Sequence, residues 1–321
     1  MNPYIGHEKQ LYGVTEARLV GGKADGMRML YVKNATGLSF AVSLDRCADI
    51  SELSFKGDNF SYFGPCGYVS PQYYDDCGAG FLKSFTAGFM TTCGLRAVGN
   101  PCHDDGEDLP LHGTIGNMPA ESASYWTTED AIHIKAIIRD AAPFSAYLIL
   151  EREYICPIHE NVIYLKDTIK NIGFKESPLE VLYHCNMGYP LLSENAKVTI
   201  PASKVEPRNE HAATALDACL TMEKPQADYE EMCFYHSLSG KPTVSIFNED
   251  IGKGLEMTYD TTELKFFTEW KMMGAGEYVL GLEPGNCIPD GRDVMRKMGE
   301  LEFLKPGEEK VHQITFKCIS K

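Results

Sequence analysis

Residues 278–286 read YVLGLEPGN, and this stretch indicates the kind of fold to expect. Its apolar first half has the length and composition of a short β-strand. The Pro284–Gly285 pair cannot continue a strand interior, so the strand is expected to end there. Glu283 therefore lies at a strand end, where a carboxylate is either simply solvated or directed at a ligand.

Short strands of the same kind are predicted along most of the chain. Alternating or apolar-rich patterns indicate strands at 132–136, 146–155, 161–169, 243–247, 264–267 and 314–318. Turn residues separate them at 56–59, 171–173, 239–242, 274–276 and 305–307. Helical features are confined to 76–96, where glycines weaken them. The pattern predicts an all-β protein, an antiparallel sandwich or barrel with few short helices.

Composition and charge narrow the class of protein. The 321 residues are 44% hydrophobic and 23% charged, and no linker-like stretch divides them, so one domain spanning 1–321 is expected. A formal net charge of −15 disfavours nucleic acid and anionic membranes as partners. No apolar run approaches the roughly 20 residues of a membrane helix, and the N-terminus lacks signal-peptide features. We therefore expect a cytoplasmic protein.

The eleven cysteines are scattered without any Cys-x-x-Cys pair. Zinc and redox sites usually show such pairs, so most of the cysteines are expected to be small buried apolar residues. The run Cys102-His103-Asp104-Asp105 is a poor metal site, because adjacent residues rarely ligate one ion. The sequence also has no glycine-rich phosphate loop. Neither a metal nor a cofactor is predicted.

Two histidines share the unusual placement of Glu283. His112 lies in the stretch LPLHG (109–113), and His184 ends the apolar run 179–184. A carboxylate and an imidazole can exchange protons near neutral pH. Such a pair can open and close a sugar ring, by deprotonating the hydroxyl on carbon 1 and protonating the ring oxygen. A histidine in a strand can equally be a hydrogen-bonded structural residue, and Glu283 a solvated strand end.

The chain resembles the aldose 1-epimerases (galactose mutarotases) from about residue 85 to the C-terminus. The resemblance lies in LPLHGTIGNMPA (109–120), in 171–192 around His184, in GLEPGN (281–286) with IPD (288–290), and in LKPGEE (304–309). It implies a large antiparallel β-sandwich, the galactose mutarotase-like supersandwich. It also implies cofactor-independent interconversion of sugar anomers.

The same resemblance implies roles for individual residues. Glu283 would be the base at the anomeric hydroxyl, His184 the acid at the ring oxygen, and His112 a group that orients the sugar. Arg96 matches an arginine found upstream of the first histidine. Further pocket candidates are Arg46 with Asp49, Trp270 with Lys271, and Arg292.

Each of these further candidates has a structural alternative. Trp270 suits the core as well as it suits a sugar platform, and Lys271 and Arg292 would more often be surface charges. Arg46 and Asp49 can form a structural ion pair. His236, in the run Cys233-Phe234-Tyr235-His236, is undecided between a structural and a functional role.

The sequence departs from typical mutarotases at two places. The aromatic run after the acid histidine is replaced by CNMGY (185–189), and the Gly-Arg-x-x-Asn-Arg segment by GLRAVGN (94–100). The second carboxylate that helps typical members bind sugar hydroxyls cannot be placed. These departures indicate a divergent bacterial branch of the family with an undefined substrate.

Several alternatives stay open at this level. The leading hypothesis is an isomerase that acts on a small-molecule sugar. A sugar-phosphate epimerase is an alternative, as is an isomerase or lyase of an oxidised sugar, and so is a noncatalytic carbohydrate-binding or sensing protein on the same fold. The sugar, its anomer and the oligomeric state are undetermined, with a homodimer among the options.

Overall fold

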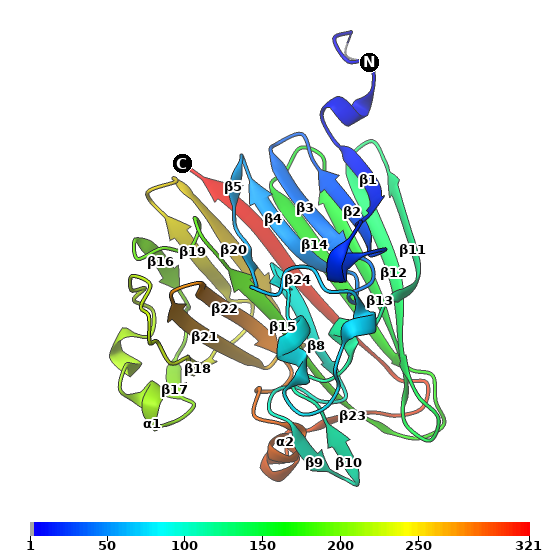
Figure 1. Ribbon diagram of the computed structural model, residues 1–321, viewed down its shortest axis with the longest axis vertical. Coiled ribbons are helices and arrows are strands. Elements are labelled where there is room, and N and C mark those ends of the chain that lie inside the picture. Colours follow the sequence, from blue (N-terminus) through cyan, green and yellow to red (C-terminus); the bar gives the residue numbers. More distant parts are fainter. Residues whose placement is uncertain (1–2) are drawn as a thin grey trace.

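β-Strands dominate the computed structural model, which describes residues 3–321. They form an eight-stranded, a seven-stranded and a five-stranded sheet in which neighbouring strands pair antiparallel. Figure 1 shows the eight-stranded sheet as a continuous layer behind the other two sheets. This arrangement confirms the predicted all-β antiparallel sandwich.

The eight-stranded sheet provides the long back layer of the sandwich. In spatial order its strands are β11 (Ala120–Thr127), β12 (Ala131–Ala141), β13 (Tyr147–Pro157), β14 (Val162–Asn171), β24 (Glu309–Ser320), β20 (Lys253–Tyr259), β19 (Thr243–Asn248) and β16 (Ala196–Thr199). The strands predicted at 132–136, 146–155, 161–169, 243–247 and 314–318 all belong to this sheet.

The seven-stranded sheet carries the residues of chemical interest. Its main path runs β17 (Lys204–Pro207), β18 (Met232–Ser237), β21 (Phe266–Gly274), β22 (Glu277–Gly285), β15 (Ser177–Met187) and β23 (Glu302–Leu304). β8 (Met90–Leu95) pairs with β15 beside this path. The strand predicted at 264–267 begins here at Phe266, as β21.

The five-stranded sheet comes from the N-terminal part of the chain. It consists of β1 (Gly13–Arg18), β2 (Arg28–Lys33), β3 (Leu38–Ser43), β4 (Asp49–Phe55) and β5 (Asp58–Asn59). Two small ladders pair β6 (Tyr62–Phe63) with β7 (Ala87–Gly88), and β9 (Cys102–Asp104) with β10 (Glu107–Leu109).

Helices are few and short, as expected. The α-helices within residues 3–321 are α1 (Glu210–Ala213) and α2 (Arg292–Met298). Single 3₁₀ turns are η1 (Glu8–Gln10), η2 (Gly22–Ala24), η3 (Pro71–Tyr73), η4 (Gly80–Ser84), η5 (Ile115–Asn117) and η6 (Leu216–Ala218). None of the described helices has the length and apolarity needed to span a bilayer.

The region 76–96 corrects one expectation from the sequence. Its helical features produce only the 3₁₀ turn η4, after which the chain extends into β7 and β8. β8 then pairs with β15. Pairing with a buried strand therefore overrides the local helical preference, as tertiary context commonly does.

One apolar core joins the three sheets. Because alternate residues of a strand point to opposite faces, each amphipathic strand sends one row of side chains inward. Leu30 of β2, Ile134 of β12, Leu280 of β22 and Phe316 of β24 all belong to this cluster and are buried. The apolar residues of the period-two patterns in the sequence are the ones whose side chains point into this core. Most cysteines are buried as predicted, and all eleven are free thiols.

A buried ion network crosses the core. The Arg152 guanidinium on β13 is fully buried and pairs with both oxygens of Asp167 on β14, at 2.9 and 2.6 Å. It also pairs with Asp49 on β4 and donates to Thr92 Oγ1 on β8 at 2.8 Å. Tyr183 on β15 donates to Asp167 Oδ2 at 2.9 Å. One cation thus links strands of all three sheets.

Replacing Arg152 with Met should strongly destabilise the protein. The change leaves Asp49 and Asp167 buried without their cation, which typically costs about 3–5 kcal/mol. Urea unfolding followed by circular dichroism would show the loss as a lower midpoint. Arg139→Met is the matched control, because Arg139 pairs with Glu121 at the surface of β12. A wild-type midpoint for Arg152→Met would contradict the structural role of the network.

Candidate active site

The strand register of the seven-stranded sheet brings Glu283 and His184 together. In the β15–β22 ladder, Cys185 pairs with Leu282 and Asn186 with Gly281, which places His184 beside Glu283. His184 Nδ1 lies 3.2 Å from Glu283 Oε1. The two side chains come from strands far apart in the sequence, and both are buried.

Gly281 makes room for the Glu283 carboxyl group. The two residues lie on the same face of β22, because they are separated by two positions. A Cβ atom on residue 281 would lie 2.2 Å from Glu283 Oε1 and 3.0 Å from the Cβ atom of Trp270. Since Trp270 is the cross-strand partner of Gly281, a larger residue would displace one or both side chains. The glycine therefore fixes where the carboxylate can sit.

Asn186 fixes the orientation of the His184 ring. Asn186 Nδ2 donates to the backbone carbonyl of His184 at 2.9 Å, so its Oδ1 faces His184 Nδ1 at 2.7 Å. Because an amide oxygen only accepts, Nδ1 carries the hydrogen. Nε2 is then the ring nitrogen left for a ligand. Glu283 Oε1 is buried and has no hydrogen-bond partner among residues 3–321.

His112 approaches the pair from a loop rather than from the sheet. It lies between β10 and η5 and has a positive φ of 59°, which is uncommon for a residue other than glycine. Gly113 follows with φ of 69°, and a Cβ there would lie 2.4 Å from the carbonyl oxygen of Gly94. The loop so positioned brings the His112 ring next to the His184 ring, and the two ring centroids lie 5.5 Å apart.

The histidines and Glu283 lie at a cleft of about 160 Å³. Trp270 packs edge-on against His184 with ring centroids 5.2 Å apart, and Phe85 does so at 5.4 Å. Phe81 contacts the His112 ring at 5.2 Å. The result is a concave site with apolar walls and a few convergent polar groups, the usual form of a small-molecule site.

Arg208 and Glu231 also line this cleft, and the sequence analysis missed both. Arg208 follows β17 and pairs with Asp290 at 2.8 Å, while its Nη2 donates to Asn100 Oδ1 at 3.0 Å. Glu231 precedes β18 and accepts from Trp270 Nε1 at 2.7 Å. No local motif marks either residue. The sequence feature that pointed to this part of the cleft is Asp290, which lies in the segment 288–290 that resembles mutarotases.

Burial changes the acidity of the central groups in opposite directions. It raises the pKa of Glu283 well above its usual value, and nearby Glu231 adds to the effect while Arg208 opposes it. Burial lowers the pKa of His184 to about 4, against the opposing effect of the Asn186 hydrogen bond. It also lowers the pKa of His112, with the neighbouring His184 contributing. The low-polarity surroundings thus favour the uncharged form of each group.

Arg46 and Asp49 lie elsewhere, and not as the ion pair considered from the sequence. The Arg46 guanidinium is buried and donates to the backbone carbonyls of Gly116, Val69 and Ser84 at 2.8–2.9 Å. Asp49 instead pairs with Arg152. Both residues hold loops and sheets together, and neither lines the cleft of His184 and Glu283.

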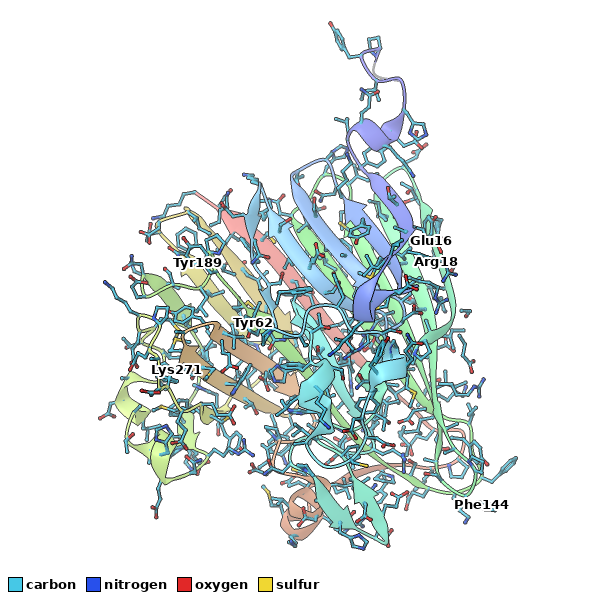
Figure 2. All side chains as sticks on the ribbon, viewed as in Figure 1. Glu16, Arg18, Tyr62, Phe144, Tyr189 and Lys271 are labelled. Atoms are coloured by element: carbon cyan, nitrogen blue, oxygen red, sulfur yellow. The ribbon has the colours of Figure 1, made fainter. Side chains whose placement is uncertain are left out.

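Lys271 points away from the cleft, although its neighbour Trp270 lines it. Successive residues of β21 face opposite sides of the sheet. Lys271 is buried and donates to the Thr221 carbonyl at 2.6 Å, and it pairs with Glu223 at 3.2 Å. Figure 2 labels Lys271 in the β21–β22 part of the molecule. The Lys271 ammonium group therefore holds the loop that contains Thr221 and does not face the cleft.

Arg96 and Arg292 lie together in a different cleft of about 590 Å³. Arg96 Nη1 pairs with Glu107 Oε1 at 2.8 Å, and Arg292 Nη2 with Glu107 Oε2 at 2.9 Å. Arg292 also binds Asp104 at 2.6 Å. This second cleft is bordered by Phe144, which Figure 2 labels far from Lys271. Of the predicted site residues, the structure therefore brings together Glu283, His184, His112 and Trp270.

Comparison with known proteins agrees with this fold. A family described as "Domain of unknown function (DUF4432)" matches residues 24–318. No curated protein matches the sequence significantly. Among solved structures, a protein from Klebsiella pneumoniae subsp. pneumoniae MGH 78578, described as a "putative aldose 1-epimerase", superimposes with a TM-score of 0.92 and 25% identity. The match covers 98% of this chain and 86% of that one.

Two further solved structures share the fold at lower identity. A galactose mutarotase-like protein from Clostridium acetobutylicum gives a TM-score of 0.69 at 14% identity, covering 97% of this chain and all (100%) of that one. Galactose 1-epimerase from Lactobacillus acidophilus NCFM gives 0.65 at 13% identity, covering 96% and 99%. The resemblance inferred from the sequence is confirmed. The chain belongs to the DUF4432 family of unknown function and has the galactose mutarotase-like fold.

Proposed function

We propose that this protein is a cofactor-independent aldose 1-epimerase, which interconverts the anomers of a sugar by acid–base opening and closure of its ring. The observation that carries the proposal is the buried Glu283 carboxyl group, 3.2 Å from His184 Nδ1. Its Oε1 atom has no hydrogen-bond partner among the described residues. A buried acceptor left without a partner is costly, and a sugar hydroxyl would satisfy it.

Other unpaired polar atoms at the cleft support a polyhydroxylated ligand. His112 Nδ1 and Thr268 Oγ1 are buried and have no hydrogen-bond partner within residues 3–321. Both residues line the cleft with Glu283. The Trp270 ring offers an apolar face on which the carbon–hydrogen side of a sugar can pack. Polar edges beside an aromatic wall suit a ligand with hydroxyls around an apolar ring.

The charges around the cleft favour a neutral sugar over a sugar phosphate. The cations among the predicted site residues are Arg46, Arg96, Lys271 and Arg292, and each is committed to carbonyl or carboxylate partners outside the cleft. Arg208 does line the cleft, but Asp290 pairs with it at 2.8 Å. With Glu231 and Glu283 also present, none of the described residues that line the cleft is an unpaired cation able to hold a phosphate.

In the proposed reaction Glu283 takes one proton from the sugar while His184 gives one to it. In the charge-separated pair, Glu283 is ionised and His184 carries hydrogens on both nitrogens. Ring opening transfers the proton of the carbon-1 hydroxyl to Glu283 and the Nε2 proton of His184 to the ring oxygen, which leaves a neutral pair. After rotation about the bond between carbons 1 and 2, closure reverses both transfers. Burial favours the uncharged groups, so the free enzyme should rest as the neutral pair, and one proton has to pass from Glu283 to His184 before ring opening.

Replacing Glu283 with Gln should slow anomer exchange by about 10²–10⁴-fold, the usual contribution of a general acid–base group. Magnetisation-transfer NMR on a panel of free and phosphorylated aldoses would measure the rate. Glu180→Gln is a matched control, because Glu180 is a buried β15 carboxylate outside the cleft that accepts from the Val98 amide.

Three outcomes would contradict the proposal. Full exchange in Glu283→Gln would remove Glu283 from the reaction. Sugar binding without any acceleration by wild type would favour a noncatalytic binding protein. Conversion of an oxidised sugar to a new product would favour isomerase or lyase chemistry at carbon.

Replacing Gly281 with Ala should also slow exchange, because the added Cβ occupies the position 2.2 Å from Glu283 Oε1. The expected defect lies in kcat more than in KM, since the shifted carboxylate fails in proton transfer. Adding Glu283→Asp, whose side chain is one methylene shorter, should recover part of the rate in this background. Exchange at the wild-type rate in Gly281→Ala would show that the carboxylate position is not limiting.

The His184 imidazole should be neutral at pH 6, with its hydrogen on Nδ1. The unfolded chain takes up this proton near pH 6.5, whereas the folded protein does so only near pH 4. The unfolded state therefore binds more protons between these values, and stability falls as the pH drops through this window. Long-range ¹H–¹⁵N NMR, assigned with His184→Gln, would show the tautomer. An imidazolium signal at pH 6 would contradict the assignment.

A further inference from the structure

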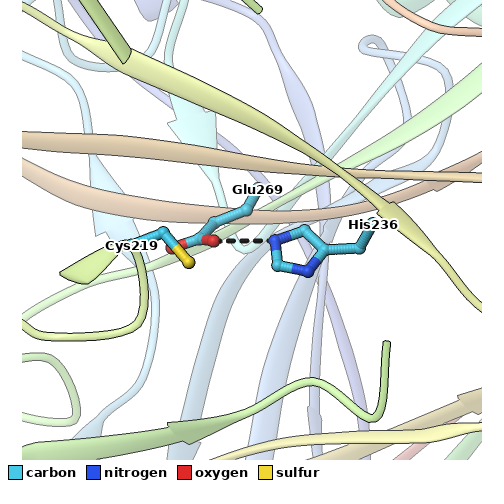
Figure 3. Close-up of side chains that lie close together, drawn as sticks. All are labelled: Cys219, His236 and Glu269. Atoms are coloured by element: carbon cyan, nitrogen blue, oxygen red, sulfur yellow. Dashed lines mark hydrogen bonds and ion pairs between the residues drawn. The ribbon is translucent and has the colours of Figure 1, made fainter. Parts of the chain in front are cut away.

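A second cluster of reactive side chains lies on the other face of the β18–β21 pair. It consists of Cys219, which follows η6, His236 of β18 and Glu269 of β21 (Figure 3). One atom from each, the sulfur, a ring nitrogen and a carboxylate oxygen, lie within 4.8 Å of one another. All three residues are buried.

Strand alternation separates this cluster from the sugar cleft. On β21, Thr268 and Trp270 face the cleft, so Glu269 between them faces the opposite side. On β18, Cys233 faces the cleft, whereas His236 packs against Phe267 on the inner side. The cluster therefore lies behind the cleft wall and takes no direct part in the proposed sugar chemistry.

Some polar atoms of the cluster have no hydrogen-bond partner among the described residues. His236 Nε2 and Glu269 Oε2 lie 2.8 Å apart and share a hydrogen bond (Figure 3), and the Cys219 thiol also interacts with the Glu269 carboxyl group. Glu269 Oε1 and His236 Nδ1 are buried without a hydrogen-bond partner in the described part of the chain. Burial also raises the pKa of the Glu269 carboxyl. A carboxylate half-satisfied in a dry interior costs stability unless something else binds it.

We propose that Cys219, His236 and Glu269 bind one divalent transition-metal ion of the zinc class. A thiolate, an imidazole and a carboxylate are all accepted zinc ligands, and the thiolate favours zinc over magnesium or calcium. Three protein ligands leave a fourth tetrahedral position for water or for the second oxygen of Glu269. Binding displaces the thiol proton and the proton shared by His236 and Glu269, so the ion replaces the hydrogen bond that joins them now.

The ion would attach the segment between β17 and β18 to the seven-stranded sheet. Cys219 belongs to the segment between β17 and β18, which also contains α1 and η6. Lys271 already holds this segment through the Thr221 carbonyl, at 2.6 Å. Arg208, which lines the sugar cleft, begins the same segment. The metal would thus cross-link this segment to the sheet behind the wall of the cleft.

Metal content and a cobalt spectrum test the proposal directly. Untagged protein, purified without chelator, should retain one equivalent of zinc by elemental analysis. Protein stripped of metal and loaded with Co²⁺ should show thiolate-to-cobalt charge transfer and the visible bands of tetrahedral Co²⁺. Cys219→Ser should abolish the charge transfer, whereas Cys318→Ser, which changes another buried thiol outside the cluster, should retain it.

Thermal unfolding separates a bound ion from a purely hydrogen-bonded cluster. Adding Zn²⁺ should raise the Tm of stripped wild type and of Cys318→Ser, because an ion that binds only the folded state stabilises it. It should leave the Tm of Cys219→Ser and Glu269→Gln unchanged. Cys219→Ser decides the matter if Glu269→Gln fails to fold. Absence of retained metal, of a cobalt spectrum and of a Tm shift in wild type would overturn the proposal, whatever the protein does with sugars.

Discussion

The buried cation of Arg152 is the interaction on which the rest of the structure depends. Its guanidinium is shared by Asp167 of the back sheet, Asp49 of the N-terminal sheet and Thr92 of β8. Separating any of these partners would leave a buried charge uncompensated, so the network holds the three sheets together at this point. β8 is in turn the partner of β15, which carries His184. The position of the candidate acid therefore follows from an ion pair deep in the core.

Strand alternation organises the chemistry at the seven-stranded sheet. One face presents Glu283, His184 and Trp270 to a cleft, and the other presents Glu269 and His236 to the interior. Antiparallel register lets neighbours in space come from distant parts of the sequence. The same sheet can thus carry the proposed sugar chemistry on one side and the proposed metal site on the other.

The predictions that held depend on local pattern or on a motif. Period-two apolar rows predicted the strands, because burial of one face requires that pattern. Motif segments predicted that Glu283, His184 and His112 would meet. The predictions for charged residues were different, since Arg46, Lys271 and Arg292 turned out to be buried with protein partners. Whether an arginine faces a cleft or a carbonyl depends on residues distant in sequence, and no local pattern encodes that choice.

The sequence by itself determined the all-β class, the positions of several strands and the family resemblance, because these follow from side-chain periodicity and short motifs. Only the tertiary structure decided which charges line the cleft, how Gly281 makes room for Glu283, and that Cys219 meets His236 and Glu269. Those features depend on strand order and register. Register is fixed by the packing of whole sheets against one core, and that packing is a property of the folded chain rather than of any segment.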